Sequence, residues 1–368
     1  MNKNLQLKIW FFTALIVLMG LVVLYSASYQ NVRVTQKVFY DQMICAGAGF
    51  ILMMILSYVD YRRFYDLSYV LYGATVFLLI LVLISGRYAL GAQRWFSIGG
   101  FSFQPSELAK LALILALGRY FSGRRSAVSF SVRSMGRTLG GDLIWPFLIT
   151  AVPMLLIFKQ PDLGTAILHM GIFLVMLFVS GLEYRYILGF LTLCVSVTPF
   201  AWHVLKPYQK DRLLVFLNPN IDPLGAGYTI IQSKIAVGSG QFLGKGWLSG
   251  TQNHLNFLPE QHTDFIFSVV GEEWGFLGAV FLLVCYAGLI ETGLKIAGQV
   301  KDKFGTYVAV GIVGILALQV VINVGMVMGL CPVVGITLPL LSYGRTSFMV
   351  FMIMMGFLLN LSRRRTIF

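Results

Sequence analysis

Long apolar stretches, joined by short polar connections, make up most of the chain. Each approaches the length of about 20 residues that a helix needs to cross a hydrocarbon core of about 30 Å. Polar and apolar residues do not alternate within these stretches, as they would in the strands of a membrane barrel. Ten spans are predicted, with approximate limits 9–26, 43–59, 67–84, 105–121, 143–158, 165–181, 186–204, 265–290, 306–329 and 346–361.

The composition agrees with this pattern. Hydrophobic residues make up 57% of the 368 positions and charged residues 12%, and the mean hydropathy is +0.79. Soluble domains average about 25% charged residues, so a soluble globular protein is excluded. Because a helix satisfies its backbone hydrogen bonds within its own segment, we predict an all-α integral membrane protein, a polytopic bundle of ten transmembrane helices. The chain shows no nucleotide-binding loop, so no organic cofactor is expected.

Basic residues indicate the orientation. With a cytoplasmic N-terminus, most Lys and Arg near the span ends fall in cytoplasmic segments, as the positive-inside rule requires. An even number of spans returns the C-terminus to the same side, where Arg363, Arg364 and Arg365 belong. The net charge of +13 is then explained by topology signals near anionic lipid, and nucleic-acid binding is not expected. We predict a multi-pass protein with both termini cytoplasmic.

One connection is much longer than the others. Residues 205–264 separate spans 1–7, within residues 1–204, from spans 8–10, within residues 265–368. Loops of this length inside compact proteins are functional or disordered, and the many apolar residues of this one argue against disorder. Its segment 228–240 is predicted to form an interfacial helix with Lys234 snorkelling at its edge. We therefore predict one long structured extracytoplasmic loop, which acts as a lid.

Three further outward-facing stretches are polar for their position: residues 91–110, 159–166 and 335–347. They face the same side as the long loop, so they are predicted to line one outward cavity. Within the first, Glu107 and Lys110 are three residues apart and share one face of a helix. Because an ionised side chain inside a membrane costs at least about 2.5–3.5 kcal/mol, the two are expected to neutralise each other. The pair either only fixes helix packing or forms a charged wall of the cavity.

The start of the eighth span carries several acids. Asp264 lies where the long loop meets this span, at the boundary between bilayer and water. Glu272 and Glu273 follow eight and nine positions later, which a continuous helix would place about 12–13 Å deeper. Two acids at that depth are costly, so Gly271 is predicted to break the segment. The span itself is then expected to begin near Trp274, an interfacial anchor.

Six segments resemble the signature segments of one family: GAQRWFSIGGFSFQPSELAK, KQPDLGTAI, PYQKDRLLVFLNP, GKGWLSGTQNHLNFLPEQHTDFIF, VVGEEWGFLGA and GITLPLLSYG. The segments occur in the same order as in the SEDS family and extend over the whole length of the chain. The ten predicted spans and the long outer loop also lie where that family has them, so the chain resembles the SEDS family. This family comprises the shape, elongation, division and sporulation proteins of bacteria. The QPDLGTAI segment, the short termini and the loop spacing resemble its elongation branch more than its division branch.

The resemblance implies a peptidoglycan glycosyltransferase of the bacterial cytoplasmic (inner) membrane, with an outward-facing active site. Its substrate is lipid II, a disaccharide-pentapeptide on an undecaprenyl pyrophosphate carrier. The family's essential loop acid maps onto Asp264, its paired acid and lysine onto Glu107 and Lys110, and its loop tryptophan onto Trp95. Arg345 is a departure, because the family commonly has a second glycine after SYG. The arginine is expected to add a cation to the cavity.

The implied reaction gives Asp264 a role. A carboxylate there is suited to act as general base toward the acceptor hydroxyl, and burial against apolar neighbours would raise its pKa. Alternatively, Thr263 and Asp264 only cap the following helix, since Asp, Ser and Thr are favoured at that position; a cap by Thr263 is compatible with catalysis by Asp264. The leaving pyrophosphate needs positive charge. The candidates are a divalent cation, Mg²⁺ or Mn²⁺, and the side chains of Arg94, Lys110, Lys159, Arg212, Lys245 and Arg345.

The other candidates keep two interpretations each. Gln160 and Asp162, beside Pro161, either shape a turn or contact the substrate, and Trp95 either stacks on a sugar ring or belongs to the aromatic belt. The expected partners are lipid II, a class B penicillin-binding protein (a transpeptidase) and other proteins of the elongation complex. Two alternatives to an enzyme stay open: a lipid II flippase or transporter, and a non-catalytic scaffold of that complex.

Overall fold

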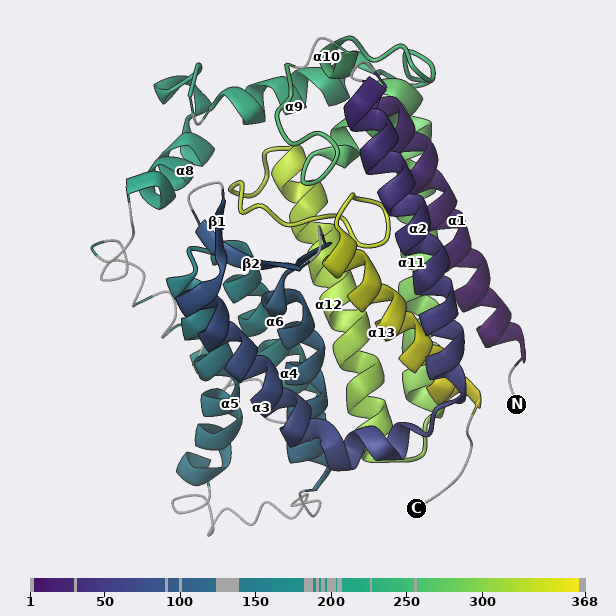
Figure 1. Cartoon of the computed structure of the whole chain (residues 1–368), viewed down its shortest axis with the longest axis vertical. Coiled ribbons are helices and arrows are strands. Elements are labelled where there is room, and N and C mark those ends of the chain that lie inside the picture. Colours follow the sequence, from purple (N-terminus) through teal and green to yellow (C-terminus); the bar gives the residue numbers. More distant parts are fainter. Residues whose placement is uncertain are drawn as a thin grey trace.

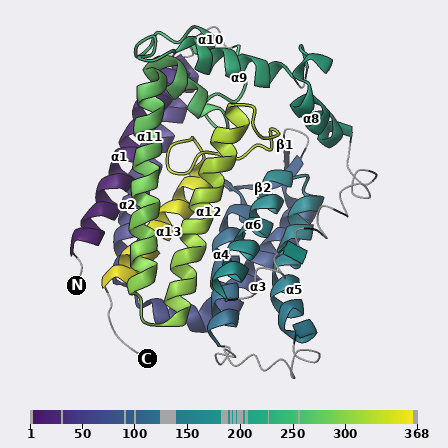
Figure 2. The same cartoon turned by 180° about the vertical axis from the view of Figure 1, so that it is seen from behind.

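Long helices run side by side through most of the molecule (Figure 1). The computed structural model describes residues 3–29, 32–89, 92–98, 101–123, 139–181, 188–189, 192, 196, 203, 207–225, 227–254 and 257–363. The start of α1 (Lys3–Ser28) and the end of α13 (Arg345–Arg363) lie at one end of the bundle. Short helices of the long loop lie across the other end, as both views show (Figures 1 and 2).

The predicted helical membrane bundle is confirmed. Six helices of the described residues are long and apolar enough to cross a membrane, and α5 and α6 contain shorter apolar helices. The seventh predicted span, 186–204, lies almost entirely outside the described residues. The other nine predicted spans fall on α1, α2 (Val32–Tyr58), α3 (Tyr61–Ser85), α4 (Pro105–Ser122), α5 (Leu139–Lys159), α6 (Leu163–Val179), α11 (Ile266–Gln299), α12 (Lys303–Val327) and α13.

A small antiparallel sheet departs from the all-α prediction. Strand β1 (Arg87–Ala89) pairs with β2 (Ala92–Ile98), and β2 pairs with β3 (Phe101–Phe103). The register places Arg87 opposite Trp95. Strands this short contain too few residues for a period-2 pattern to stand out, and their stability comes from pairing with one another. The sheet gives the polar stretch between α3 and α4 a defined structure.

Helix α4 occupies the middle of the bundle, packed against α3, α6 and α12. Its residues 109–118 are all buried. Apart from Lys110, the helix is apolar on every side along this stretch, which is the pattern of a helix enclosed by others. Its N-terminal turn carries Glu107 and Lys110, so these two charges lie inside the protein and away from lipid.

The long loop forms the structured lid that its composition predicts. It contains α8 (Pro207–Leu217), a 3₁₀ turn (Pro219–Ile221), α9 (Tyr228–Ser239) and α10 (Thr251–His254). The helix predicted at 228–240 is present as α9, which packs on α11 and α12. There, the hydroxyl of Ser233 donates to the backbone carbonyl of Val327 over 2.8 Å. The place of α9 at the membrane interface stays a prediction.

The predicted break at Gly271 is wrong. Helix α11 continues through Gly271, and its one non-helical residue within the described helix is Gly275 (φ 62°, ψ −158°). A Cβ atom on Gly275 would lie 2.3 Å from the backbone nitrogen of Gly244 in the lid. The lid backbone thus approaches α11 too closely for any side chain, and the positive φ also favours glycine. The kink lies where the lid meets α11, four residues beyond the predicted position.

The two acids before this kink bind the lid and α1. Glu272 accepts hydrogen bonds from Lys245 Nζ at 2.8 Å and from the Thr251 hydroxyl at 3.1 Å. Glu273 accepts one from the hydroxyl of Ser26. Both acids are buried, and their partners offset the cost of removing them from water. These contacts pin the lid to the start of α11.

Candidate active site

A polar cavity of about 580 Å³ lies where the lid, the small sheet and the bundle meet. Side chains from β2, α4, α6, α8, the segment before α11 and the loop before α13 form its walls. Seven of the predicted site residues line it: Arg94, Trp95, Glu107, Asp162, Arg212, Asp264 and Arg345. The other polar residues of the wall are Ser102, Gln104, Thr165, Gln209, Glu260, Thr263, Gln319, Thr337, Tyr343, Thr346 and Ser347. The three polar stretches and the long loop therefore meet at one cavity.

Asp264 lies just before α11, and its side chain borders the cavity. The N-cap position of α11 is occupied by Phe265, without a side-chain hydrogen bond. The hydroxyl of Thr263 donates instead to the backbone carbonyl of Glu260, over 3.2 Å. The capping alternative is therefore wrong for both Thr263 and Asp264, and capping does not explain the carboxylate.

Burial raises the pKa of Asp264 to about 7, since its carboxylate is largely shielded from water. The negative charges of Glu260 and Asp162 raise this pKa further, whereas Arg212 and Arg94 oppose them. A carboxylate with a pKa near neutrality is a stronger base than an ordinary aspartate and still partly ionised at neutral pH. The surroundings of Asp264 thus favour proton transfer.

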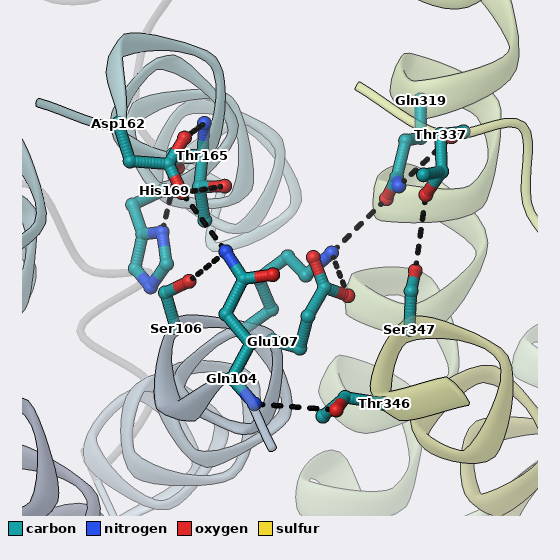
Figure 3. A network of polar contacts seen from close by, with 11 residues as sticks. Gln104, Ser106, Glu107, Asp162, Thr165, His169, Gln319, Thr337, Thr346 and Ser347 are labelled. Atoms are coloured by element: carbon teal, nitrogen blue, oxygen red, sulfur yellow. Dashed lines mark hydrogen bonds and ion pairs between the residues drawn. The ribbon is translucent and has the colours of Figure 1, made fainter. Parts of the chain in front are cut away.

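Glu107 and Lys110 form the predicted ion pair, with 2.7 Å between Oε2 and Nζ. Lys110 is fully buried, while Glu107 borders the cavity. Lys110 Nζ also donates to Gln319 Oε1 at 3.3 Å, and Gln319 Nε2 donates to the carbonyl of Thr337 at 3.1 Å. Figure 3 shows this chain of contacts from α4 across α12 to the loop before α13. The pair therefore joins helices and supplies one charged wall as well.

Asp162 both shapes a turn and borders the cavity. It caps α6 by accepting from the Thr165 backbone N–H at 3.1 Å and the Thr165 hydroxyl at 3.0 Å. Gln104 Nε2 donates to the same carboxylate at 3.1 Å (Figure 3). Arg94 lies 3.9 Å away and also donates to the carbonyl of Pro161 at 2.8 Å. This network fixes β2 and the ends of α4 and α6 around the cavity.

Arg345 is part of the cavity wall at the start of α13. Its guanidinium pairs with Asp41 of α2, and the hydroxyl of Tyr343 lies 3.5 Å from the same carboxylate. The departure from the expected glycine therefore adds a cation to the wall, with a counterion behind it.

Four residues predicted to contact the substrate or its pyrophosphate lie outside the cavity wall. Lys159 is the last residue of α5 and is exposed. Gln160 directly follows α5 and is buried, and its amide donates to the carbonyl of Leu79 at 3.0 Å. Lys245 is held by Glu272, because the lid is pinned to α11 there. Lys110 is enclosed behind Glu107. Contacts of Gln160 and Lys245 with the substrate were predicted because both residues lie in polar segments of the sequence. The packing of α5 and of the lid turns these side chains towards protein groups instead.

Other members of the site were not predicted. Gln319 is an amide within an apolar span, and a polar side chain at such a position usually has a functional or structural reason. This feature of the sequence could have identified Gln319 as a site residue. Gln104 directly precedes Pro105 and the Glu107 turn. Glu260 borders the cavity beside Asp264, but in the sequence it is one of several polar residues of a loop and nothing singles it out.

The chain is similar to known proteins over nearly its whole length. The family model described as "Cell cycle protein", which covers FtsW, RodA and SpoVE, matches residues 6–367. The peptidoglycan glycosyltransferase MrdB of Escherichia coli K12 is 40% identical over 359 residues, which are 96% of this chain and 93% of that protein. Among solved structures, one of a peptidoglycan synthase complex superposes with a TM-score of 0.80 at 38% identity and covers 97% of both chains. The rod shape determining protein RodA of Thermus thermophilus superposes with a TM-score of 0.71 at 34% identity, over 97% of this chain and 96% of that one. This chain therefore belongs to the FtsW, RodA and SpoVE family of cell cycle proteins, the SEDS family.

Proposed function

We propose that this chain polymerises lipid II into glycan strands during cell elongation and shape maintenance, with Asp264 as the general base. The chain is a peptidoglycan glycosyltransferase. The observation that carries the assignment of the base is the carboxylate of Asp264, which borders a polar cavity and has a pKa raised to about 7.

The proposed reaction joins two lipid-linked sugars. The acceptor hydroxyl gives its proton to Asp264 while its oxygen attacks the anomeric carbon of the donor, and a new glycosidic bond forms. The bond between that carbon and the pyrophosphate oxygen breaks, and undecaprenyl pyrophosphate leaves with the electron pair. Asp264 then releases the proton to solvent. General-base assistance of this kind typically contributes about 10²–10⁴-fold.

Positive charge near the base supports release of the pyrophosphate. Arg94 and Arg212 are the cations whose charge acts on the pKa of Asp264, and both line the cavity. We assign the leaving group to this side of the cavity. Arg345, backed by Asp41, is the cation of a different wall and fits contacts to the second lipid-linked substrate.

A divalent cation, Mg²⁺ or Mn²⁺, is compatible with the carboxylates of the cavity. The described residues contain no group of three or more His, Cys, Asp or Glu side chains able to hold a metal ion. Mg²⁺, however, commonly takes only one or two carboxylates together with substrate phosphates. Glu260, beside Asp264 in the wall, is the carboxylate that fits this role. A bound ion would supply charge to the pyrophosphate.

The position of the cavity suits a lipid-linked substrate, whose carrier stays in the bilayer while its sugars lie in water. The cavity is at the lid end of the bundle, opposite the start of α1 and the end of α13 (Figure 1). Together with the positive-inside rule, this supports cytoplasmic termini and an outward-facing site in the bacterial cytoplasmic membrane. The similarity to a peptidoglycan synthase complex supports a class B penicillin-binding protein as partner, with other elongation proteins around it.

One assay tests the function against its alternatives. Full-length chain is purified with and without its transpeptidase partner and given lipid II, with Mg²⁺, Mn²⁺ or chelator. Glycan strands, resolved by gel electrophoresis, are the expected product. A parallel vesicle assay measures transfer of lipid II between leaflets: transfer without glycan would favour a flippase, and neither activity would favour a scaffold.

The Gly335→Ala protein is expected to polymerise lipid II more slowly, because the substitution strains the backbone of a residue that lies directly beside the carboxylate of Asp264. Gly335 has φ +72°, and an added Cβ would lie 3.4 Å from Asp264 Oδ2. Gly181→Ala is the matched control, because Gly181 has φ +81° with open space around its Cβ position. Both substitutions impose similar backbone strain of about 1–2 kcal/mol, seen as a lower melting temperature. Only Gly335→Ala should lower the polymerisation rate, and equal rates would show that Gly335 does not affect the base.

A further inference from the structure

The consecutive carbonyl groups of His262, Thr263 and Asp264 accept hydrogen bonds from residues outside their own segment. The backbone N–H of Tyr343 donates to the carbonyl of His262 over 2.9 Å. The hydroxyl of Ser342 donates to the carbonyl of Thr263 over 2.6 Å. The loop before α13 therefore binds the chain along the two residues that precede Asp264.

The next carbonyl, that of Asp264 itself, is bound by Asn323 of α12. Asn323 Nδ2 lies 2.9 Å from the carbonyl oxygen of Asp264 and 2.6 Å from that of Ile336. An amide nitrogen carries two hydrogens, so it donates one to each carbonyl. Asn323 has none of its surface exposed. A single buried side chain thus joins the backbone of the base to the loop on the other side of the cavity.

Both of the joined elements determine where the Asp264 carboxylate lies. Helix α11 begins after Phe265 without a side-chain cap, so no cap of the helix anchors the preceding residue. On the other side, Gly335 is a neighbour of the carboxylate, since a Cβ there would be in van der Waals contact with Asp264 Oδ2 at 3.4 Å. Gly335 directly precedes Ile336, whose carbonyl Asn323 holds. Release of the amide would free the base and the neighbouring loop together.

We propose that Asn323 is a positioning residue that fixes Asp264 in the geometry needed to accept the proton of the acceptor hydroxyl. This inference rests on the proposed role of Asp264 as base. Its physical reason is that proton transfer and attack need the reacting atoms in near-contact geometry, and a displacement of about 1 Å can cost on the order of 10²-fold in rate.

The chain offers a matched control for the loss of such an amide. Asn360 of α13 is 1% exposed, and its Nδ2 donates to the carbonyls of Leu56 and Val59. Asn360 therefore joins two segments by the same pair of bonds, between the ends of α13 and α2 that lie away from the lid (Figure 1). A replacement there removes equivalent hydrogen bonds without affecting the cavity.

The experiment compares Asn323→Leu with Asn360→Leu in the full-length chain, because leucine is nearly isosteric with asparagine. The readouts are thermal unfolding in detergent and the kcat and KM for polymerisation of lipid II. Both variants should melt at similarly lowered temperatures. We expect kcat of Asn323→Leu to fall on the order of 10²-fold with KM little changed, and Asn360→Leu to keep the wild-type kcat. Asn323→Gln keeps the amide and should recover part of the lost kcat.

Each outcome decides between the alternatives. Equal kcat values for the two leucine variants would overturn the positioning role. Should Asn323→Leu fail to fold, Ser342→Ala replaces it, since it removes the neighbouring donor to Thr263. A wild-type kcat in Ser342→Ala would then count against the proposal, and a selective fall in kcat would support it. If the assignment of Asp264 as base were wrong, the Asp264→Asn protein would be active, irrespective of the effect of substituting Asn323. The two failures can therefore be distinguished.

Discussion

An Asp264→Asn protein is expected to polymerise lipid II about 10²–10⁴-fold more slowly than the wild type. The amide keeps the size of the side chain but has no basic oxygen to accept the proton of the acceptor hydroxyl. The measurement is the initial rate of glycan synthesis by the full-length chain. Asp211→Asn is the control, because Asp211 is an exposed carboxylate on α8 and should be replaceable without effect. A wild-type rate in Asp264→Asn would remove the base from the mechanism.

Thermal stability separates this loss of chemistry from a loss of fold. The folded protein raises the pKa of Asp264 from 3.8 to about 7, so between these values it binds a proton that the unfolded chain has released. The stability of the wild type should therefore fall as pH rises through this window. Asp264→Asn has no such charge to bury, so it should be at least as stable as the wild type at alkaline pH, with the difference shrinking as pH falls towards 4.

The second large effect concerns the buried ion pair. Glu107→Gln leaves Lys110 charged in an enclosed site, and Lys110→Met leaves Glu107 without its cation. Removing one partner of a buried pair costs about 3–5 kcal/mol, whereas removing both is often far less harmful. We therefore expect the double variant Glu107→Gln/Lys110→Met to give more folded protein than either single variant, measured by yield after detergent extraction and by melting temperature.

An exposed pair on another helix provides the comparison. Glu291 and Lys295 are four residues apart on α11 and both exposed, and such pairs contribute about 0–1 kcal/mol. Single and double substitutions there should leave the yield unchanged. Equal yields among the three Glu107 and Lys110 variants would show that these two charges are not buried together.

The bundle was predictable because long apolar stretches have few alternatives to a membrane helix. The pairing of Glu107 with Lys110 followed from helical spacing, and the special position of Asp264 followed from the end of an apolar stretch. Each of these inferences uses neighbours in the sequence. The local pattern of the sequence is therefore sufficient to predict an element that is long and contains few charges.

Features set by contacts between distant segments, or by elements too short to show a pattern, escaped prediction. The kink lies at Gly275 rather than Gly271 because the lid backbone at Gly244 approaches there. The sheet around Trp95 depends on the pairing of strands too short to show a pattern. Gln160 precedes the polar turn at Pro161 but faces the carbonyl of Leu79, a direction that depends on how α5 packs on α3. Neither Gly244 nor Leu79 is near its partner in the sequence.

The dependence of kcat on pH tests the base role of Asp264 most directly. With a pKa of about 7 in the folded protein, the ionised base becomes more abundant as pH rises. The kcat of the wild type should therefore increase through a midpoint near pH 7 and level off above it, and the residual rate of Asp264→Asn should lack this rise. A wild-type kcat that does not change across neutral pH, or the same rise in Asp264→Asn, would contradict the role of Asp264 as general base.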